Sequence, residues 1–354
     1  SRRSRRAGVR GAWQERHATA ARHVAMNGIS TYRVIAGAML IAAILIGIAS
    51  CHIKAQSEFM RGEGMPYDAF DRLPKTDLDV PGGTIHVAFA PGDMALPKDR
   101  IFDWVRASAR AVSIYYGRFP VSSLRLLIVP VDGSRVRGGT TWGYRGAAIR
   151  LPIGRDAGAD DLKRDWVIVH EMVHTALPDL DDRYAWLSEG LAVYVEPVAR
   201  VQAGDLTAQE IWQAMMRDMP KGLPQAGDQG LDNTDTWGRK YWGGAMFCLF
   251  ADVEIRKRTG NKFGLQDAMR GVLAAGGNHE KDWPIGRVLA TADKAVGVDV
   301  LERLHSAWGS KPVTPDLAAL WRDLGVTLQG NGVTFDDGAP LAAIRKAITE
   351  ARPH

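Results

Sequence analysis

Cysteine is scarce in this chain, because Cys51 and Cys248 are the only two among 354 residues. A disulfide framework is therefore excluded, and stability must come from a hydrophobic core. Cys248 lies within the apolar run 246–250, which predicts a small buried side chain. The sequence also lacks an internal repeat, a glycine-rich phosphate loop and a serine-nucleophile elbow. These absences argue against repeat folds, phosphate-loop nucleotidases and serine hydrolases of the elbow type.

The sequence has no excess of positive charge outside the N-terminal segment. The formal net charge is +5, but residues 1–33 contain eight Arg and one Glu, so the other 321 residues carry a net charge of −2. A nucleic-acid-binding domain normally carries a clustered basic surface. The sequence therefore predicts no nucleic-acid partner.

Long hydrophobic runs are also rare, and the one at 34–50 contains no charged residue. Its seventeen residues are at the short limit for a membrane-spanning helix and slightly long for the apolar region of a signal peptide. The end of the run, Ile48-Ala49-Ser50-Cys51, resembles the bacterial lipobox. That resemblance implies cleavage before a lipidated Cys51. A single-pass anchor is the alternative. Both interpretations predict an extracytoplasmic, membrane-anchored protein.

The stretch 170–174, His-Glu-Met-Val-His, brings metal-binding side chains together. Residues four apart lie on one face of a helix, so His170 and His174 can present two imidazoles to one metal ion. Glu171 then stands beside the open position of that metal. In this pattern the histidines bind Zn²⁺ and the glutamate accepts a proton from water. A helix that carries two histidines without a metal is the alternative that five residues alone leave open.

The flanking residues predict a helix that extends from about 159 to 177. Asp160 and Asp161 place negative charge and capping groups at its N-terminal end, and Pro178 ends it. Between them, apolar residues follow at helical spacing: Leu162, Trp166, Val169, Val173 and Leu177. Both histidines are therefore expected in the last two turns of a mostly buried helix, where imidazoles without partners would be costly.

A second predicted helix begins at Trp186 and offers a third ligand, Glu189, in its first turn. Two His and one Glu leave the fourth tetrahedral position for water, as a catalytic zinc site requires. HEMVH followed by WLSEGLAVYVE resembles the gluzincin metallopeptidases, in particular the peptidase MA-like family. The resemblance implies Zn²⁺ held by His170, His174 and Glu189. It also implies an α+β, zincin-like catalytic domain with an N-terminal small sheet plus helices and a C-terminal mainly helical part.

The same resemblance implies catalytic roles. Glu171 would be the general base in peptide-bond hydrolysis and would later deliver its proton to the leaving amine. Tyr241 precedes Gly-Gly-Ala much as a family tyrosine precedes Gly-Ala, although Gly243 replaces the family's lysine. Its phenol would hydrogen-bond the oxyanion.

A glycine-bracketed hairpin is predicted over 138–151, and an ordinary hairpin is an equally good interpretation of these residues alone. In gluzincins the corresponding strand is an exposed edge that pairs with the substrate backbone. Residues 138–150 contain no Asp or Glu. The large gluzincin aminopeptidases hold the substrate amine with a carboxylate from this region, so an aminopeptidase of that type is not favoured.

The predicted organisation has four parts. They are a basic N-terminus with a signal peptide or anchor at 1–51, a linker at 52–78, a gluzincin-like metallopeptidase domain at 79–328, and a C-terminal hairpin and helix at 329–354. Val193 stands where thermolysin-like enzymes carry an Asp that orients a ligand histidine. Asp181, Asp182 and Glu196 are therefore unranked candidates for that task.

The leading functional hypothesis is a membrane-anchored, extracytoplasmic zinc metallopeptidase that acts on a peptide or protein substrate. Two other classes stay open. One is a zinc-binding scaffold lipoprotein without turnover, and the other is a zinc amidase that acts on a non-peptide bond of the cell envelope.

Overall fold

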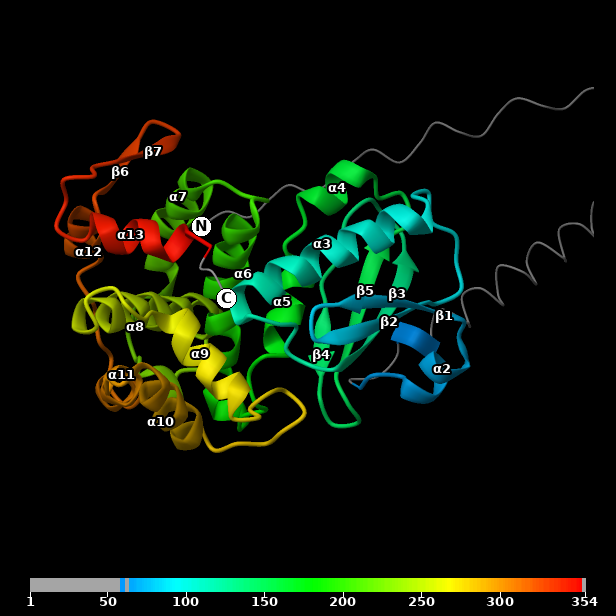
Figure 1. Cartoon of the computed structure of the whole chain (residues 1–354), viewed down its shortest axis with the longest axis horizontal. Helices are drawn as coiled ribbons and strands as arrows, with labels where there is room; N and C mark the ends of the chain where they lie inside the picture. The colour runs from blue at the N-terminus through cyan, green and yellow to red at the C-terminus, as the bar shows by residue number, and fades with distance from the viewer. Residues whose placement is uncertain (1–57, 61–63, 352–354) are drawn as a thin grey trace, which may run out of the picture. The chain divides into compact units, whose positions relative to one another are not determined.

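The computed structural model describes residues 58–60 and 64–351, all within one compact unit, His52–His354 (Figure 1). The predicted signal or anchor run 34–50 and the predicted lipidation site Cys51 lie outside the described residues. Among the described helices, none is both long and apolar enough to cross a bilayer.

A five-stranded mixed sheet has the order β1-β2-β3-β5-β4. Its strands are β1 (Lys75–Val80), β2 (Gly83–Phe89), β3 (Ser123–Val131), β4 (Thr140–Trp142) and β5 (Ala148–Gly154). The three central strands are parallel to one another, whereas β1 and β4 pair antiparallel at the two edges. The hairpin predicted before the metal helix is therefore β4–β5, and it leaves β4 as an edge strand.

The central strand β3 is buried on both faces, as its continuous apolar sequence predicts. Leu126 and Ile128 belong to the large core, which includes α3 (Lys98–Tyr116). Leu127 and Val129 belong to a smaller core with α2 (Tyr67–Arg72). The two helices thus cover opposite faces of the sheet.

The predicted linker at 52–78 is wrong for its later part, because α2 and most of β1 lie within it. The strand escaped prediction because its sequence is mostly polar. Leu78 alone is buried in β1, and the remaining side chains stand at the outer edge of the sheet. Phe59, Met65 and Phe70 anchor this segment in the smaller core.

The predicted helix 159–177 is divided in the structure, with α4 at Ala159–Lys163 and α5 at Val167–His174. The division follows from Asp165, whose Oδ2 accepts a hydrogen bond from the backbone N–H of Ile168 at 3.2 Å. A carboxylate at this place starts a new helix by satisfying one of its free N–H groups. All eight residues of α5 are buried.

Helix α6 (Ala185–Ala203) and helix α8 (Gly244–Arg258) cross at very close range. A Cβ on Gly244 would lie 1.9 Å from the carbonyl oxygen of Trp186, and one on Gly190 would lie 2.2 Å from the carbonyl carbon of Gly244. Both positions therefore require glycine. The close crossing brings the residues just before α8 next to the start of α6.

The remaining elements are mostly helical, as predicted. They are α7 (Ala208–Asp218), α9 (Leu265–Ala274), α10 (Ile285–Val296), α11 (Val300–Trp308), α12 (Leu317–Leu324), the hairpin β6 (Val326–Gln329) and β7 (Gly332–Phe335), and α13 (Ala342–Thr349). The α+β class with an N-terminal small sheet and a mainly helical C-terminal part is thereby confirmed (Figure 1).

Candidate metal centre

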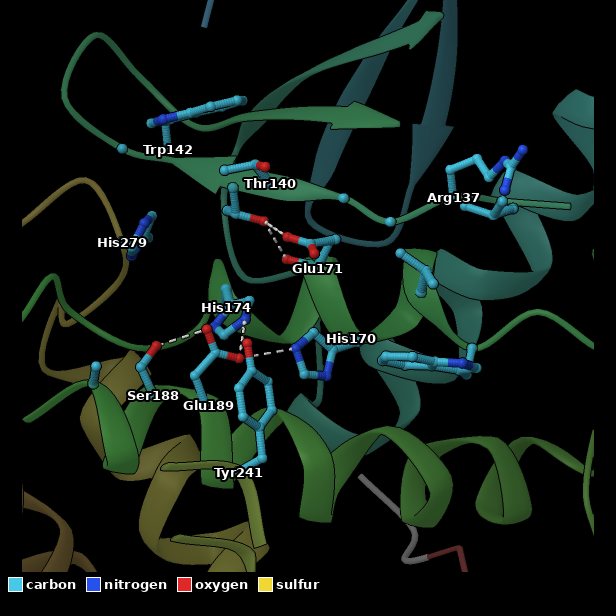
Figure 2. A pocket seen from close by; sticks show the side chains of 18 of the residues that line it. Arg137, Thr140, Trp142, His170, Glu171, His174, Ser188, Glu189, Tyr241 and His279 are labelled. Atoms are coloured by element: carbon cyan, nitrogen blue, oxygen red, sulfur yellow. Dashed lines mark hydrogen bonds and ion pairs between the residues drawn. The ribbon is translucent and has the colours of Figure 1, made fainter. Parts of the chain in front are cut away.

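The three predicted ligands meet between α5 and α6 (Figure 2). Oε2 of Glu189 lies 3.2 Å from Nε2 of His170 and 3.5 Å from Nε2 of His174. The two histidines share one face of α5, and Glu189 faces them from the first turns of α6. The ligand atoms of the three residues all lie within 4.8 Å of one another, so they could hold one metal ion.

The two histidines and Glu189 are mostly buried, and each alters the protonation of the others. His170 and His174 are 5% and 9% exposed, so their charges are poorly solvated. Burial acts to raise the pKa of Glu189, but hydrogen bonds from the two histidines outweigh it and hold that pKa well below its usual range. Burial acts to lower the pKa of His174, but Glu189 reverses the direction and raises it. Two imidazole nitrogens and one ionised carboxylate oxygen are a donor set that fits Zn²⁺.

Glu171 faces the edge strand β4. Its Oε2 accepts a 2.6 Å hydrogen bond from the hydroxyl of Thr141, which also donates to the Glu171 carbonyl at 3.0 Å. A Cβ on Gly139 would lie 2.7 Å from Oε1 of Glu171. Only glycine at 139 therefore lets the backbone lie this close to the Glu171 side chain, while Thr141 holds Oε2.

The group that orients His174 is Ser188, at 3.0 Å between Oγ and Nδ1. None of the three predicted candidates does so. Asp181 caps a 3₁₀ turn through the N–H of Arg183, Asp182 lies at the cavity wall, and Glu196 pairs with Arg200 at 2.7 Å. Sequence reasoning missed Ser188 because no motif or residue spacing marks a serine beside the ligand Glu189 as a partner of His174. Nδ1 of His170 is buried without a hydrogen-bond partner among the described residues.

Tyr241 reaches the same centre from a π-helical segment, Gly238–Gly243, immediately before α8 (Figure 2). Burial, the nearby charges of Glu189 and Glu171, and a hydrogen bond to Glu189 raise the pKa of its hydroxyl to about 12. The structure therefore brings Tyr241 together with the three candidate ligands and Glu171. The π-helix itself was not predicted.

A cavity of about 1020 Å³ opens along the centre. One wall is the edge strand β4 and the turns around it, and another is formed by α5 and the first turn of α6. Strand β4 and helix α5 run in the same direction along it, so the cavity has an Arg137 end and a His279 end (Figure 2).

The His279 end is bounded by the loop 275–284, which sequence reasoning did not assign to the site. The N–H of His279 donates to the carbonyl of Thr175 at 3.2 Å, and the N–H of Ala147 donates to Glu280 at 3.0 Å. A Cβ on Gly143 would lie 1.7 Å from the carbonyl oxygen of His279. Burial and the nearby His174 lower the pKa of His279, and Asp179 opposes them.

The fold is similar to that of an aminopeptidase N family protein from Idiomarina loihiensis, with a TM-score of 0.55 and 17% sequence identity. That match covers 73% of this chain and 50% of the other. An M1 zinc metallopeptidase from Deinococcus radiodurans matches with a TM-score of 0.45 and 17% identity, over 69% of this chain and 53% of that one. This chain thus spans about half the length of these neighbours. No family model matches the sequence, and no curated protein matches it.

Proposed function

We propose that this protein is a zinc metallopeptidase that hydrolyses peptide bonds. The observation that carries the proposal is the convergence of His170, His174 and Glu189 beside Glu171, all facing one cavity next to an edge strand. The shared fold with an aminopeptidase N family protein supports it. An edge strand also suits a peptide, because an extended chain can pair with such a strand through backbone hydrogen bonds.

His170, His174 and Glu189 would hold Zn²⁺, which supplies Lewis-acid chemistry by lowering the pKa of a water and polarising a carbonyl. Glu171 accepts the proton of the attacking water and later delivers it to the leaving amine. Thr141 already donates a hydrogen bond to Oε2 of Glu171, so Oε1 is the oxygen proposed to take the proton. Tyr241 donates a hydrogen bond to the oxyanion as the carbonyl becomes tetrahedral.

We also propose that the catalytic part works outside the cytoplasm, tethered to a membrane. The support is in the sequence alone: the uncharged run 34–50 and the lipobox-like end at Cys51. Mass spectrometry of the membrane fraction would detect a lipid on Cys51. An unmodified Cys51 in a protein that still partitions with membranes would favour the single-pass anchor.

The test of function combines metal analysis with hydrolysis of a broad quenched-peptide library by residues 52–354. We expect about one zinc per chain, and Glu171→Gln should keep the zinc while turnover falls by about 10²–10⁴-fold. Glu302→Gln on α11 is the control, since that side chain is exposed and lies outside the cavity.

Substantial peptidase activity in Glu171→Gln would overturn the assigned role of Glu171. One zinc without cleavage in either protein would instead favour a binding lipoprotein or a non-peptide amide as substrate. Hydrolysis of envelope-derived amides would then indicate the non-peptide substrate, and no hydrolysis would indicate the binding lipoprotein.

A further inference from the structure

Trp166 lies in the wall of the cavity, and 51% of its surface is exposed, which is unusual for a large aromatic side chain. It occupies the N-cap position of α5, where its side chain makes no capping hydrogen bond. A polar cap such as Ser or Asp is the usual residue at this position. Helix capping therefore gives no reason for tryptophan here, and neither does burial in the core.

The ring lies next to the candidate metal centre. Its centroid is 5.3 Å from that of His170, and the two rings are nearly perpendicular at 86°. Successive residues of an extended peptide are about 3.3 Å apart. If an extended substrate has its scissile carbonyl at the metal, the side chain one or two residues from that carbonyl would thus reach the indole ring.

Trp166 lies at the Arg137 end of the cavity, because α5 begins there and its C-terminal end meets His279. Charged side chains of both signs line this end, because Arg135, Arg137 and Arg164 lie there together with Asp161 and Asp165. Arg164 pairs with Asp161 at 3.0 Å. The indole ring of Trp166 is thus a large apolar surface among charges that partly offset one another.

We propose that Trp166 forms the subsite for a large apolar, preferably aromatic, side chain of the substrate, next to the scissile bond and toward Arg137. This inference rests on the proposed peptidase function and adds its substrate class. Aromatic pairs gain stacking or edge-to-face attraction beyond their buried area. A rigid indole at the mouth of a cavity also loses little conformational entropy when a ligand covers it.

The first experiment measures hydrolysis of a position-scanning peptide library by the zinc-loaded protein. We expect kcat/KM to be at least about 10-fold higher for Phe or Trp than for Ala at one position beside the scissile bond. Trp166→Ala should reduce that preference to less than about 3-fold, and Trp166→Phe should keep most of it. The zinc content of each variant is measured alongside, because Trp166 touches His170.

Tyr144→Ala is the matched control. Tyr144 is also an exposed aromatic residue of the cavity wall, at 63%, but it follows Gly143 at the His279 end. Its removal should leave the preference at the Trp166 position unchanged. An unchanged preference in Trp166→Ala, or a preference for Asp or Glu at this position, would overturn the proposal.

The second experiment measures peptide affinity by calorimetry in the Glu171→Gln background, where no turnover is needed. Aromatic peptides should bind more tightly than their Ala counterparts, and Trp166→Ala should abolish the difference. If this holds but the wild-type chain cleaves nothing, the peptidase function fails and the subsite stands. If peptides are cleaved but the difference persists in Trp166→Ala, the subsite fails and the function stands. Peptides that neither bind nor are cleaved contradict both.

Discussion

The orientation of single rings decides what the candidate metal centre can bind. His174 turns Nε2 toward Glu189 and Nδ1 toward Ser188. If Nε2 is the metal ligand, Nδ1 carries the hydrogen and donates it to the Ser188 hydroxyl. Such a partner fixes both the tautomer and the direction of the ring. Ser188 therefore contributes to the site by orienting His174, not as a metal ligand.

Replacing Ser188 by alanine should weaken zinc binding by about 10–100-fold, because His174 loses the group that orients it. Competition with a chromophoric chelator measures the affinity. Ser306→Ala is the control, since that hydroxyl bonds within α11 to the carbonyl of Glu302. Equal zinc affinity in the two variants would remove Ser188 from this role.

Tyr241→Phe should lower kcat by about 10²–10³-fold, the usual effect of deleting one oxyanion donor. KM and zinc content should change little, since the phenol is proposed to act in the transition state. Steady-state kinetics on a cleaved library peptide provides both constants. Tyr184→Phe, which lies outside the cavity wall, should behave as wild type. A change confined to KM would show that Tyr241 binds substrate without stabilising the oxyanion.

Among the elements, the π-helix Gly238–Gly243 matters most, because it carries Tyr241. A buried ion pair links this π-helix to the loop that precedes it. Arg239 lies 2.7 Å from Asp228, both side chains are 2% exposed, and Arg239 also donates to the Gly222 carbonyl at 2.7 Å. Burial lowers the pKa of Arg239, while Asp228 opposes that shift. Isolated π-helical turns are common at functional sites.

Asp228→Asn should destabilise the protein by about 3–5 kcal/mol, because it leaves a buried guanidinium without its counter-charge. Urea unfolding at neutral pH measures the change. The double variant Asp228→Leu/Arg239→Met is the control. With no charge left to bury, it should recover most of the lost stability. A loss in the double variant as large as in Asp228→Asn would mean that packing, not charge, explains the effect.

For the whole molecule, the site depends on how the sheet and the helical part meet. The sheet supplies β4 and Thr141, whereas the helical part supplies Tyr241 and the loop with His279. The stability of the whole molecule should also depend on pH, through the buried carboxyl group of Glu196 on α6. Burial raises the pKa of Glu196 to about 7, even though Arg200 lies 2.7 Å away, and the nearby Asp165 adds to the shift.

A carboxyl whose pKa is raised in the folded state binds its proton more tightly there than in the unfolded chain. Its favourable contribution is therefore complete below its ordinary pKa of about 4.3 and is lost as the pH rises toward 7. The unfolding free energy of wild type relative to Glu196→Gln should fall over this window, on the order of 1–3 kcal/mol, and stay constant above it. Denaturant unfolding at pH 4.5–8 measures the difference. A difference that rises with pH would contradict the raised pKa.

Local geometry accounts for what the sequence by itself determined. The spacing of His170 and His174 places both rings on one helix face wherever that helix lies, and Glu171 follows from the same turn. The apolar run of β3 and the glycine-bracketed hairpin also follow from residues close together in the chain. Glu189 was reachable because its helix is next along the chain and the two stretches together resemble a known family.

Tertiary structure decided everything that depends on segments far apart in the chain. The π-helix that contains Tyr241 and the strand β1 at the sheet edge each arise from contacts that periodicity does not record. Thr141 meets Glu171 across 30 residues, and the loop with Glu280 meets Ala147 across 133. Trp166 fits the apolar spacing of a core helix, yet it is half exposed because the helix restarts after it. Only the packed chain could show which apolar residues are covered and which one faces the cavity.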